Sequence, residues 1–540
     1  MKHQPAVFTC KMAQQILRCP GEIHPPLACY PSHAERSRCL MLFNSYVFIF
    51  LYLPVVLLGF FWLARVSHAF AAGWLALASL LFYGYWNPAY IGLLLGSIVC
   101  NYALGLWIVK AGLRAKDRGL SVGRKKRLLI IAIAANLALL AYYKYANFFV
   151  GSINSVANTQ WSLGEIMLPL GISFFTFTQI AFLVDTYQGK VKEYNFIHYL
   201  LFVTYFPHLI AGPILHHKEM MPQFAHASTY RVNWDHVATG LLLFTLGLCK
   251  KVLWADSLAP FATAIFDGTR HGMAIGTLPT IYEAWSGALA YTLQIYFDFS
   301  GYTDMALGIA LMFGIRLPIN FNSPYKATSI IEFWRRWHIT LSRFLRDYLY
   351  IPLGGNRKGE LRRYQNLMIT MLLGGLWHGA GWTFVIWGAL HGVYLTINHL
   401  WRELVAERFL RGIPNWLGAL AGGALTFVAV VAAWVVFRAD NMAQALAILK
   451  AMFGIASRPI SFDAVMHGNL LLLTDMSGRD LARLLVPGLL WVWLLPNSSC
   501  IRFIKGNALL ALLQAALVLG MLYLAIDQFG SYSPFLYFQF

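Results

Sequence analysis

The chain has 540 residues, of which 58% are hydrophobic, 15% are aromatic and only 12% are charged. A composition this apolar excludes an ordinary soluble domain and predicts a polytopic membrane protein. The formal net charge is +19, but the Lys and Arg residues are grouped in short loops beside apolar runs. This grouping is typical of cytoplasmic membrane loops rather than of a nucleic-acid-binding surface.

The first forty residues differ from the rest of the chain and contain no apolar stretch long enough for a signal peptide. Their cysteines lack the paired spacing of a zinc site, so we expect no metal here. They are Cys10, Cys19, Cys29 and Cys39. We interpret residues 1–40 as an N-terminal extension that is disordered or foreign to the natural product. Because the first membrane run begins directly after Met41, we expect a protein starting there to insert and function like the full chain.

Apolar runs long enough for membrane helices of about 20 residues follow in close succession. They are residues 44–64, 68–87, 89–109, 128–149, 166–185, 197–215, 236–255, 281–313, 366–397, 416–437, 481–497 and 508–526. We predict an all-α fold with roughly 10 to 12 membrane helices and some interfacial or re-entrant helices. Runs of this length without alternation exclude a β-barrel. No intervening stretch is long enough for its own core, so residues 41–540 should form one domain.

Two basic stretches define the expected topology. Residues 110–127 hold eight Lys or Arg and one acid, Asp117, which predicts a cytoplasmic loop. Counting back three spans places the N-terminus of the core domain in the periplasm. Residues 326–363 hold nine Lys or Arg and three acids, mixed in the first half with aromatic residues. This half suits an amphipathic helix at the membrane surface, which either contacts headgroups alone or also attracts a phosphate-bearing donor such as a coenzyme A thioester.

Two polar islands interrupt the apolar sequence. In residues 296–304, Asp298 and Asp304 lie roughly 120 degrees apart on a regular helix, so they need not share a face. Asp298 either pairs with a buried Arg, His or Tyr as a structural contact or orients a catalytic imidazole. Residues 206–214 combine two prolines, a glycine and His208, which predicts a broken helix lining a cavity.

Three histidines in aromatic and glycine-rich settings are the main candidates for chemistry: His338, His378 and His391. His378 lies within residues 367–395, which contain no Lys, Arg, Asp or Glu. A titratable group at membrane depth is costly and is therefore a functional candidate. Burial disfavours a charged imidazole, and the neutral form can act as a general base toward a hydroxyl that attacks an acyl donor.

His391 follows His378 by thirteen residues, or about 220 degrees on a continuous helix, so the two should not face the same cavity. We favour His378 as catalytic, because it lies in the charge-free interior and is flanked by Trp377 and Trp382, and we expect His391 to be structural. The spacing of the glycine pairs Gly375/Gly379 and Gly388/Gly392 predicts closely packed helices.

Several motifs, taken in order, resemble those of the membrane-bound O-acyltransferases, on the alginate O-acetylase branch. The matching stretches include residues 41–48, 168–177, 206–213, 294–302, 333–342, 375–392 and 535–540. The resemblance implies a funnel-shaped helical protein with an active histidine in a central tunnel, which matches His378. It also implies a second sensitive histidine in the Arg335-Arg336-Trp337-His338 motif. Asp298, Trp377, Arg335, Arg336 and His391 are then candidate supporting residues.

Relatives of this kind take an acyl group from a cytoplasmic donor and pass it across the inner membrane. The expected activity is O-acetylation of an exopolysaccharide, most of all alginate, with acetyl-CoA as donor and no tightly bound cofactor. The expected partners are membrane lipid, a periplasmic acetyltransferase and a polysaccharide-secretion complex. Acetylation of cellulose or peptidoglycan and D-alanyl transfer to teichoic acid use the same chemistry and stay open. A lipid or sugar transporter without acyl chemistry is the alternative of another class.

Overall fold

The computed structural model describes residues 41–117, 123–274, 278–406, 414–459, 477–501, 508–529 and 535–536. All regular secondary structure within these ranges is helical, as predicted, and the ranges belong to one compact unit, Met41–Phe540. The expectations for residues 1–40 concern a segment outside the described residues.

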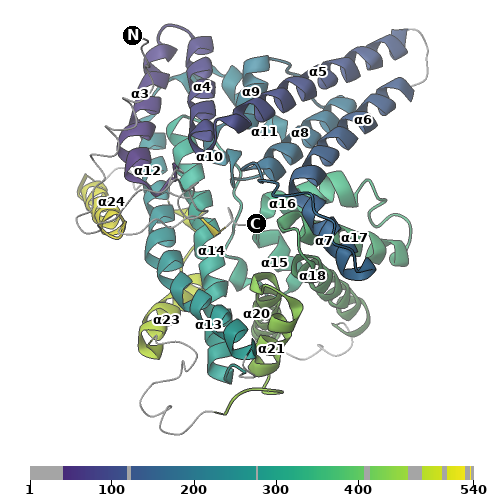
Figure 1. Cartoon of the computed structure of the whole chain (residues 1–540). Helices are drawn as coiled ribbons and strands as arrows, with labels where there is room; N and C mark the ends of the chain where they lie inside the picture. Colours follow the sequence, from purple (N-terminus) through teal and green to yellow (C-terminus); the bar gives the residue numbers. More distant parts are fainter. Residues whose placement is uncertain are drawn as a thin grey trace, which may run out of the picture. The chain divides into compact units, whose positions relative to one another are not determined.

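Seven helical segments in the described ranges are long and apolar enough to cross a membrane, which makes the chain a multi-pass membrane protein. In chain order they are formed by η2 (Val47–Tyr52) with α3 (Leu53–Ala64), α4 (His68–Trp86), α5 (Ala89–Asp117), α6 (Gly123–Leu140) with η3 (Ala141–Tyr145) and α7 (Ala146–Ala157), α12 (Trp234–Cys249) with η5 (Lys250–Ala255) and α13 (Asp256–Ala274), α20 (Asn415–Arg438), and α24 (Ala508–Asp527). In Figure 1, α3 lies beside α4 and α5 lies beside α6.

The other predicted runs form helices that do not meet this criterion, so the expected number of 10 to 12 spans is not reached by length and composition in the described ranges. These helices are α8 (Ile172–Tyr187), α9 (Phe196–Thr204), α14 (Ile281–Met312), α17 (Glu360–His378), α18 (Trp382–Trp401) and α23 (Gly478–Leu494). The difference arises because an apolar run can also serve as a buried core helix. Helix α14 is the clearest case, since it is buried along most of its length.

Helices α12 and α14 approach each other through two reciprocal glycine contacts. A Cβ atom added to Gly308 would lie 2.4 Å from the carbonyl oxygen of Gly240. A Cβ atom added to Gly247 would lie 2.5 Å from the carbonyl oxygen of Gly301. The backbones therefore touch, as small residues permit in membrane helices, and this contact brings η5 against the middle of α14.

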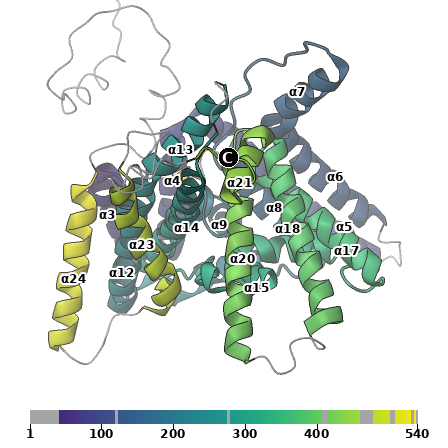
Figure 2. The same ribbon diagram turned by 90° about the horizontal axis from the view of Figure 1, so that it is seen from below.

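The run 366–397 is not one helix, which corrects the premise used to separate His378 from His391. Helix α17 ends at His378 and α18 begins at Trp382, because extended backbone at Gly379 and Gly381 interrupts the helix. The two helices lie side by side (Figure 2). A Cβ atom on Gly388 would lie 2.3 Å from the carbonyl oxygen of Met371, so the predicted close packing at these glycines is confirmed.

The break predicted in residues 206–214 is present. Helix α9 ends at Thr204, a single turn follows as α10 (Phe206–Leu209), and irregular backbone leads to α11 (His217–Ala225). His208 is buried in this segment. Helix α10 packs against α4 and α14, so the broken run enters the protein core rather than facing lipid as a regular span.

The first half of the basic stretch 326–363 is also divided. It forms α15 (Ile330–Arg336), α16 (Ile339–Leu345) and the π-helical η7 (Arg346–Tyr350), instead of the one amphipathic helix expected. The interruption lies at Trp337 and His338, and both residues are buried. Breaking the helix at this point turns His338 into the core, which a continuous surface helix could not do.

Candidate active site

His378 is the last residue of α17, and its imidazole lies among aromatic rings. The ring centroids of Trp387 and Phe437 lie 5.2 Å and 5.5 Å from that of His378, and both rings stand nearly perpendicular to it. The neighbouring Trp377 ring lies 5.0 Å away. His378 itself is only 6% exposed. Such an apolar enclosure favours a neutral imidazole that can accept a proton.

His338 is fully buried and occupies the N-cap position of α16 with φ 42° and ψ 53°. A left-handed conformation at a non-glycine residue costs on the order of 1 to 2 kcal/mol, and such strain is concentrated at functional sites. Asn320 Oδ1 lies 3.1 Å from His338 Nδ1 and also accepts a bond of 2.8 Å from Thr340 Oγ1. If Nδ1 carries the proton that this contact requires, the lone pair of His338 is on Nε2.

The structure brings His338 and His378 together from two separate helical segments. Their ring centroids lie 6.3 Å apart, and the Trp377 ring lies 6.1 Å from that of His338. Three residues predicted from the sequence therefore form one cluster: His338, Trp377 and His378. The arrangement places two imidazoles within reach of one small reacting group.

His391 is adjacent to this cluster, and the Trp387 ring contacts both His391 and His378. The Trp387 centroid lies 4.7 Å from His391 and 5.2 Å from His378. His391 Nδ1 accepts a hydrogen bond of 3.3 Å from Trp334 Nε1, and His391 is completely buried. The two histidines lie on separate helices and share Trp387 as a neighbour, so the angle around one continuous helix does not decide whether they face the same cavity.

Asp298 is paired with a lysine, and not with the Arg, His or Tyr or the catalytic imidazole considered for it from the sequence. Its Oδ1 atom lies 2.8 Å from Lys251 Nζ, and its Oδ2 atom accepts a bond of 3.0 Å from the backbone N–H of Leu536. The second carboxylate of this island, Asp304, pairs with Lys250 at 2.6 Å. Because both oxygens of Asp298 are used in this way, its position supports a structural contact and not the orientation of an imidazole.

The two candidate arginines lie on α15, outside the histidine cluster. Arg336 pairs with Glu332 at 2.7 Å and donates to the carbonyl oxygen of Asn322 at 3.2 Å. Arg335 is exposed. Arg336 therefore stabilises the local fold of the basic stretch, whereas Arg335 is placed where it can meet a soluble or headgroup anion.

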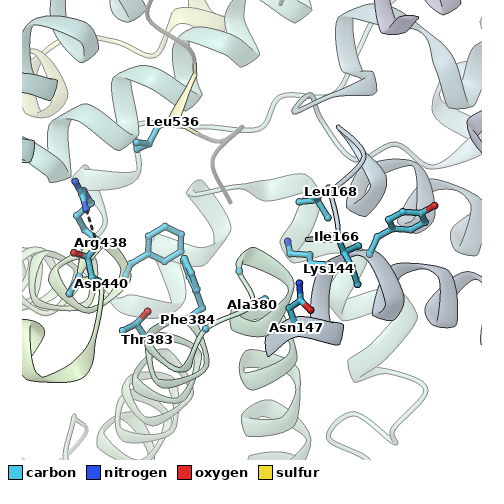
Figure 3. Close-up of a pocket in the computed structure, with 15 residues that line it drawn as sticks. Lys144, Asn147, Ile166, Leu168, Ala380, Thr383, Phe384, Arg438, Asp440 and Leu536 are labelled. Carbon is cyan, nitrogen blue, oxygen red and sulfur yellow. Dashed lines mark ion pairs between the residues drawn. The ribbon is translucent and has the colours of Figure 1, made fainter. Parts of the chain in front are cut away.

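A pocket of about 550 Å³ opens beside the turn that follows His378. In Figure 3, Lys144 and Asn147 lie on one side of this pocket, the ion-paired Arg438 and Asp440 lie on the other, and Phe384 lies between. The remaining lining residues are Tyr143, Ile166, Leu168, Gly379, Ala380, Gly381, Thr383, Phe437, Ala439 and Leu536. Phe437 lines this pocket and also contacts the ring of His378, so the pocket is next to the histidine cluster.

A row of aromatic rings connects the same cluster to the basic stretch. From Trp377 the row continues to Phe177 at 5.3 Å, to Phe344 at 4.3 Å and to Tyr348 at 5.0 Å between ring centroids. Tyr348 donates a hydrogen bond of 2.9 Å to Asp185. An apolar wall thus extends from η7 to the imidazole of His378.

Within the described ranges, no group of three or more His, Cys, Asp or Glu side chains is arranged to hold a metal ion. The cysteines in residues 1–40 lie outside the described ranges.

The region containing this cluster matches the family model described as MBOAT, membrane-bound O-acyltransferase family, over residues 182–438. The chain is also 42% identical, over 93% of its length and 98% of the relative's, to the peptidoglycan O-acetyltransferase of Helicobacter pylori. The chain belongs to the membrane-bound O-acyltransferase family. The family resemblance seen in the sequence is thereby confirmed, and the protein is an O-acyltransferase.

Other relatives of this O-acyltransferase are named for different substrates. It is 44% identical, over 78% of its length and 76% of the relative's, to the probable alginate O-acetylase of Pseudomonas aeruginosa. It is 28% identical, over 43% of its length and 60% of the relative's, to the teichoic acid D-alanyltransferase of Bacillus subtilis. The histidine cluster lies within the matched family region, since His338, His378 and His391 all fall between residues 182 and 438.

Sequence reasoning missed several residues that lie around the histidine cluster or form buried ion pairs in the core. Lys144 is the one charged residue in the run 128–149, and an ionisable side chain inside an apolar run is a functional candidate, so this signal was present. Lys250 and Lys251 interrupt the run 236–255 in the same way. Asn320 and Trp387 offered no comparable signal, because their proximity to the histidines depends on the packing of distant segments.

Replacing His391 by alanine is expected to lower stability more than catalysis. The change removes the bond from Trp334 and the contact with Trp387, and truncating a buried side chain of about this size to alanine costs about 2 to 5 kcal/mol. We expect a lower melting temperature in detergent, with activity per folded molecule within a few-fold of the parent. Wild-type thermal stability combined with loss of activity would contradict the structural role of His391.

Proposed function

We propose that this O-acyltransferase moves an acetyl group from cytoplasmic acetyl-CoA across the inner membrane for O-acetylation of an extracellular polysaccharide, with His378 as the general base. The observation that carries the proposal is the pairing of His338 and His378, whose ring centroids lie 6.3 Å apart inside an aromatic enclosure. Two buried imidazoles on separate helices are expensive to maintain and suit a reaction that needs a proton acceptor.

The basic stretch supports a cytoplasmic donor side. Its positive charge attracts the phosphates of coenzyme A, and Arg335 is exposed on α15. The aromatic row from Tyr348 to Trp377 leads from this stretch to His378 and provides an apolar surface for the arm that carries the thioester. In this arrangement His338 orients the donor, because it belongs to the basic stretch and its ring lies beside that of His378.

The reaction balances without a cofactor. His378 accepts the proton of the attacking hydroxyl while the hydroxyl oxygen bonds to the acetyl carbon. The carbon–sulfur bond of the thioester then breaks, and the proton passes from the imidazolium to the departing thiolate. An ester and a free thiol are the products, and His378 returns to its neutral form.

The pocket beside residues 379–381 is the proposed acceptor side. It shares Phe437 with the aromatic rings around His378, and Thr383 and Asn147 supply polar groups to it. Lys144 also lines the pocket, but its amino group is bonded to the end of α17. With residues 110–127 in the cytoplasm, the apolar segment Gly123–Ala157 carries Lys144 toward the periplasm. A separate periplasmic acetyltransferase could receive the acetyl group there and transfer it to the polymer within a secretion complex.

Alginate is the leading candidate for the polymer, because the sequence motifs resemble those of the alginate O-acetylase branch. Peptidoglycan is the second candidate. The specific reason for retaining peptidoglycan is the match to the Helicobacter pylori peptidoglycan O-acetyltransferase, which covers nearly the whole of both chains. The probable alginate O-acetylase of Pseudomonas aeruginosa is slightly more identical but is matched over a smaller share.

The test compares acetate released by mild alkali from purified exopolysaccharide and from purified peptidoglycan of the same cells. Cells with the parent protein should carry ester-linked acetate on one of these polymers, and cells with His378→Ala should lack it. Acetate on exopolysaccharide alone supports alginate-type acetylation, which sugar analysis of that polymer then identifies. Acetate on peptidoglycan alone would make peptidoglycan, and not alginate, the proposed polymer. If the ester-linked acetate of neither polymer depends on the protein, the proposal is overturned.

A further inference from the structure

Two consecutive side chains of η3 bond to the end of α17, which is more than 230 residues away in the chain. Lys144 Nζ lies 2.6 Å from the carbonyl oxygen of Trp377 and 3.2 Å from that of His378. Tyr145 donates its hydroxyl proton to the carbonyl oxygen of Leu376 at 2.9 Å. Three successive carbonyl groups at the end of the helix thus receive bonds from one short segment.

These carbonyl groups need external partners because α17 stops at His378. The last four carbonyls of an α-helix have no partner within the helix, and Gly379 continues in extended conformation. Unpaired carbonyl groups in a buried setting are costly. The donors from η3 therefore stabilise a helix end that the sequence of α17 alone would leave incomplete.

We propose that Lys144 and Tyr145 are positioning residues for His378, holding the end of α17 so that the imidazole keeps its orientation for proton transfer. The inference rests on the proposed role of His378. The amino group of Lys144 is occupied by two carbonyl groups and by Ser173 Oγ at 3.4 Å. With three partners around it, Lys144 acts through the helix end and not on the substrate.

The π-helical conformation of η3 explains how neighbouring residues can both reach α17. Consecutive side chains of a regular α-helix point well apart, whereas the wider turn of a π-helix reduces their separation around the axis. Such π-helical turns inside α-helices are frequent at functional sites. Here the turn lies between α6 and α7 at residues Ala141–Tyr145, at the level where the apolar segment passes the end of α17.

The position of the bonded carbonyls makes the link to catalysis specific. One of them belongs to His378 itself and another to Trp377, whose ring contacts both His338 and His378. A small rotation of this last turn would move the His378 ring relative to His338. Displacements of about 1 Å at a reacting group can reduce the rate about a hundredfold.

The test measures kcat and the KM for acetyl-CoA separately for Lys144→Met, Lys144→Arg and Tyr145→Phe. Lys144→Met keeps the chain length but removes the hydrogen-bond donors, and it should lower kcat about 10- to 100-fold with little change in KM. Lys144→Arg restores donors and should recover most of kcat. Tyr145→Phe removes one bond and should lower kcat a few-fold. Tyr142→Phe, at an exposed neighbour, is the matched control with parental kinetics.

A parental kcat in Lys144→Met, a loss that Lys144→Arg does not recover, or a loss confined to KM would overturn the inference. If Lys144→Met does not accumulate as folded protein, Tyr145→Phe decides, and a parental kcat in that variant would overturn it. His378→Ala is measured in parallel. An inactive His378→Ala beside a fully active Lys144→Met refutes the positioning role alone, whereas an active His378→Ala refutes the proposed function on which it rests.

Discussion

Replacing His378 by alanine is expected to abolish polymer acetylation while leaving the amount of protein in the membrane unchanged. Alanine fits the space at the end of α17 but cannot accept a proton, and loss of a general base reduces rates by about 10² to 10⁴-fold. The measurement is ester-linked acetate on the polymer, normalised to the quantity of folded protein. His378→Gln, which retains more of the side-chain volume, should be equally inactive because an amide is not a base at neutral pH.

The exposed residue His226 supplies a control for the loss of a histidine as such, and His226→Ala should behave like the parent. His391→Ala supplies the closer comparison, because this histidine lies one ring away and should chiefly affect stability. Full acetylation by His378→Ala would exclude it as the base. An inactive, stably inserted His391→Ala together with an active His378→Ala would instead assign the chemistry to His391.

Replacing Lys251 by methionine is expected to destabilise the protein strongly. Lys251 is almost completely buried and pairs with Asp298 at 2.8 Å and with Asp256 at 2.6 Å. Removing it leaves the carboxylate of Asp298 buried without its cation, and breaking a buried pair in this way costs about 3 to 5 kcal/mol. The expected result is a large drop in the temperature at which the detergent-solubilised protein unfolds, with a smaller yield of inserted protein.

Two comparisons identify the cause of that drop. Lys251→Met combined with Asp298→Asn removes both charges of the pair and should recover part of the lost stability, because no charge on Asp298 then remains unpaired. Arg483→Met breaks an ion pair with Asp480 whose side chains are 78% and 56% exposed, and it should cost less than about 1 kcal/mol. An unfolding temperature close to the parent's in Lys251→Met would show that the buried pair is not a determinant of stability.

The buried pair of Asp298 and Lys251 was only half predictable from the sequence. Asp298 was identified as a buried carboxylate that needs a partner, and this need is evident from its apolar surroundings. The sequence did not identify its partner, because Lys251 lies on a segment 47 residues earlier in the chain. Only the close contact of α12 with α14 through Gly240, Gly247, Gly301 and Gly308 brings the two charges together.

Length, hydrophobicity and charge distribution by themselves determined that this is a helical multi-pass membrane protein, because backbone groups in lipid must bond within their own segment. The motifs around His338 and His378 determined its family, since their residue types and order recur there. Local chemistry also predicted the break in residues 206–214, because proline and glycine disrupt a helix wherever it lies.

Tertiary structure decided which of these residues meet. The turn at residues 379–381 replaced a continuous helix by the pair α17 and α18, so the angle around one helix does not separate His378 from His391, and both contact Trp387. The left-handed conformation at His338 and the bonds from Lys144 and Tyr145 likewise depend on remote segments. Sequence periodicity describes one helix at a time, whereas the geometry of this site arises from contacts between helices that are distant in the chain.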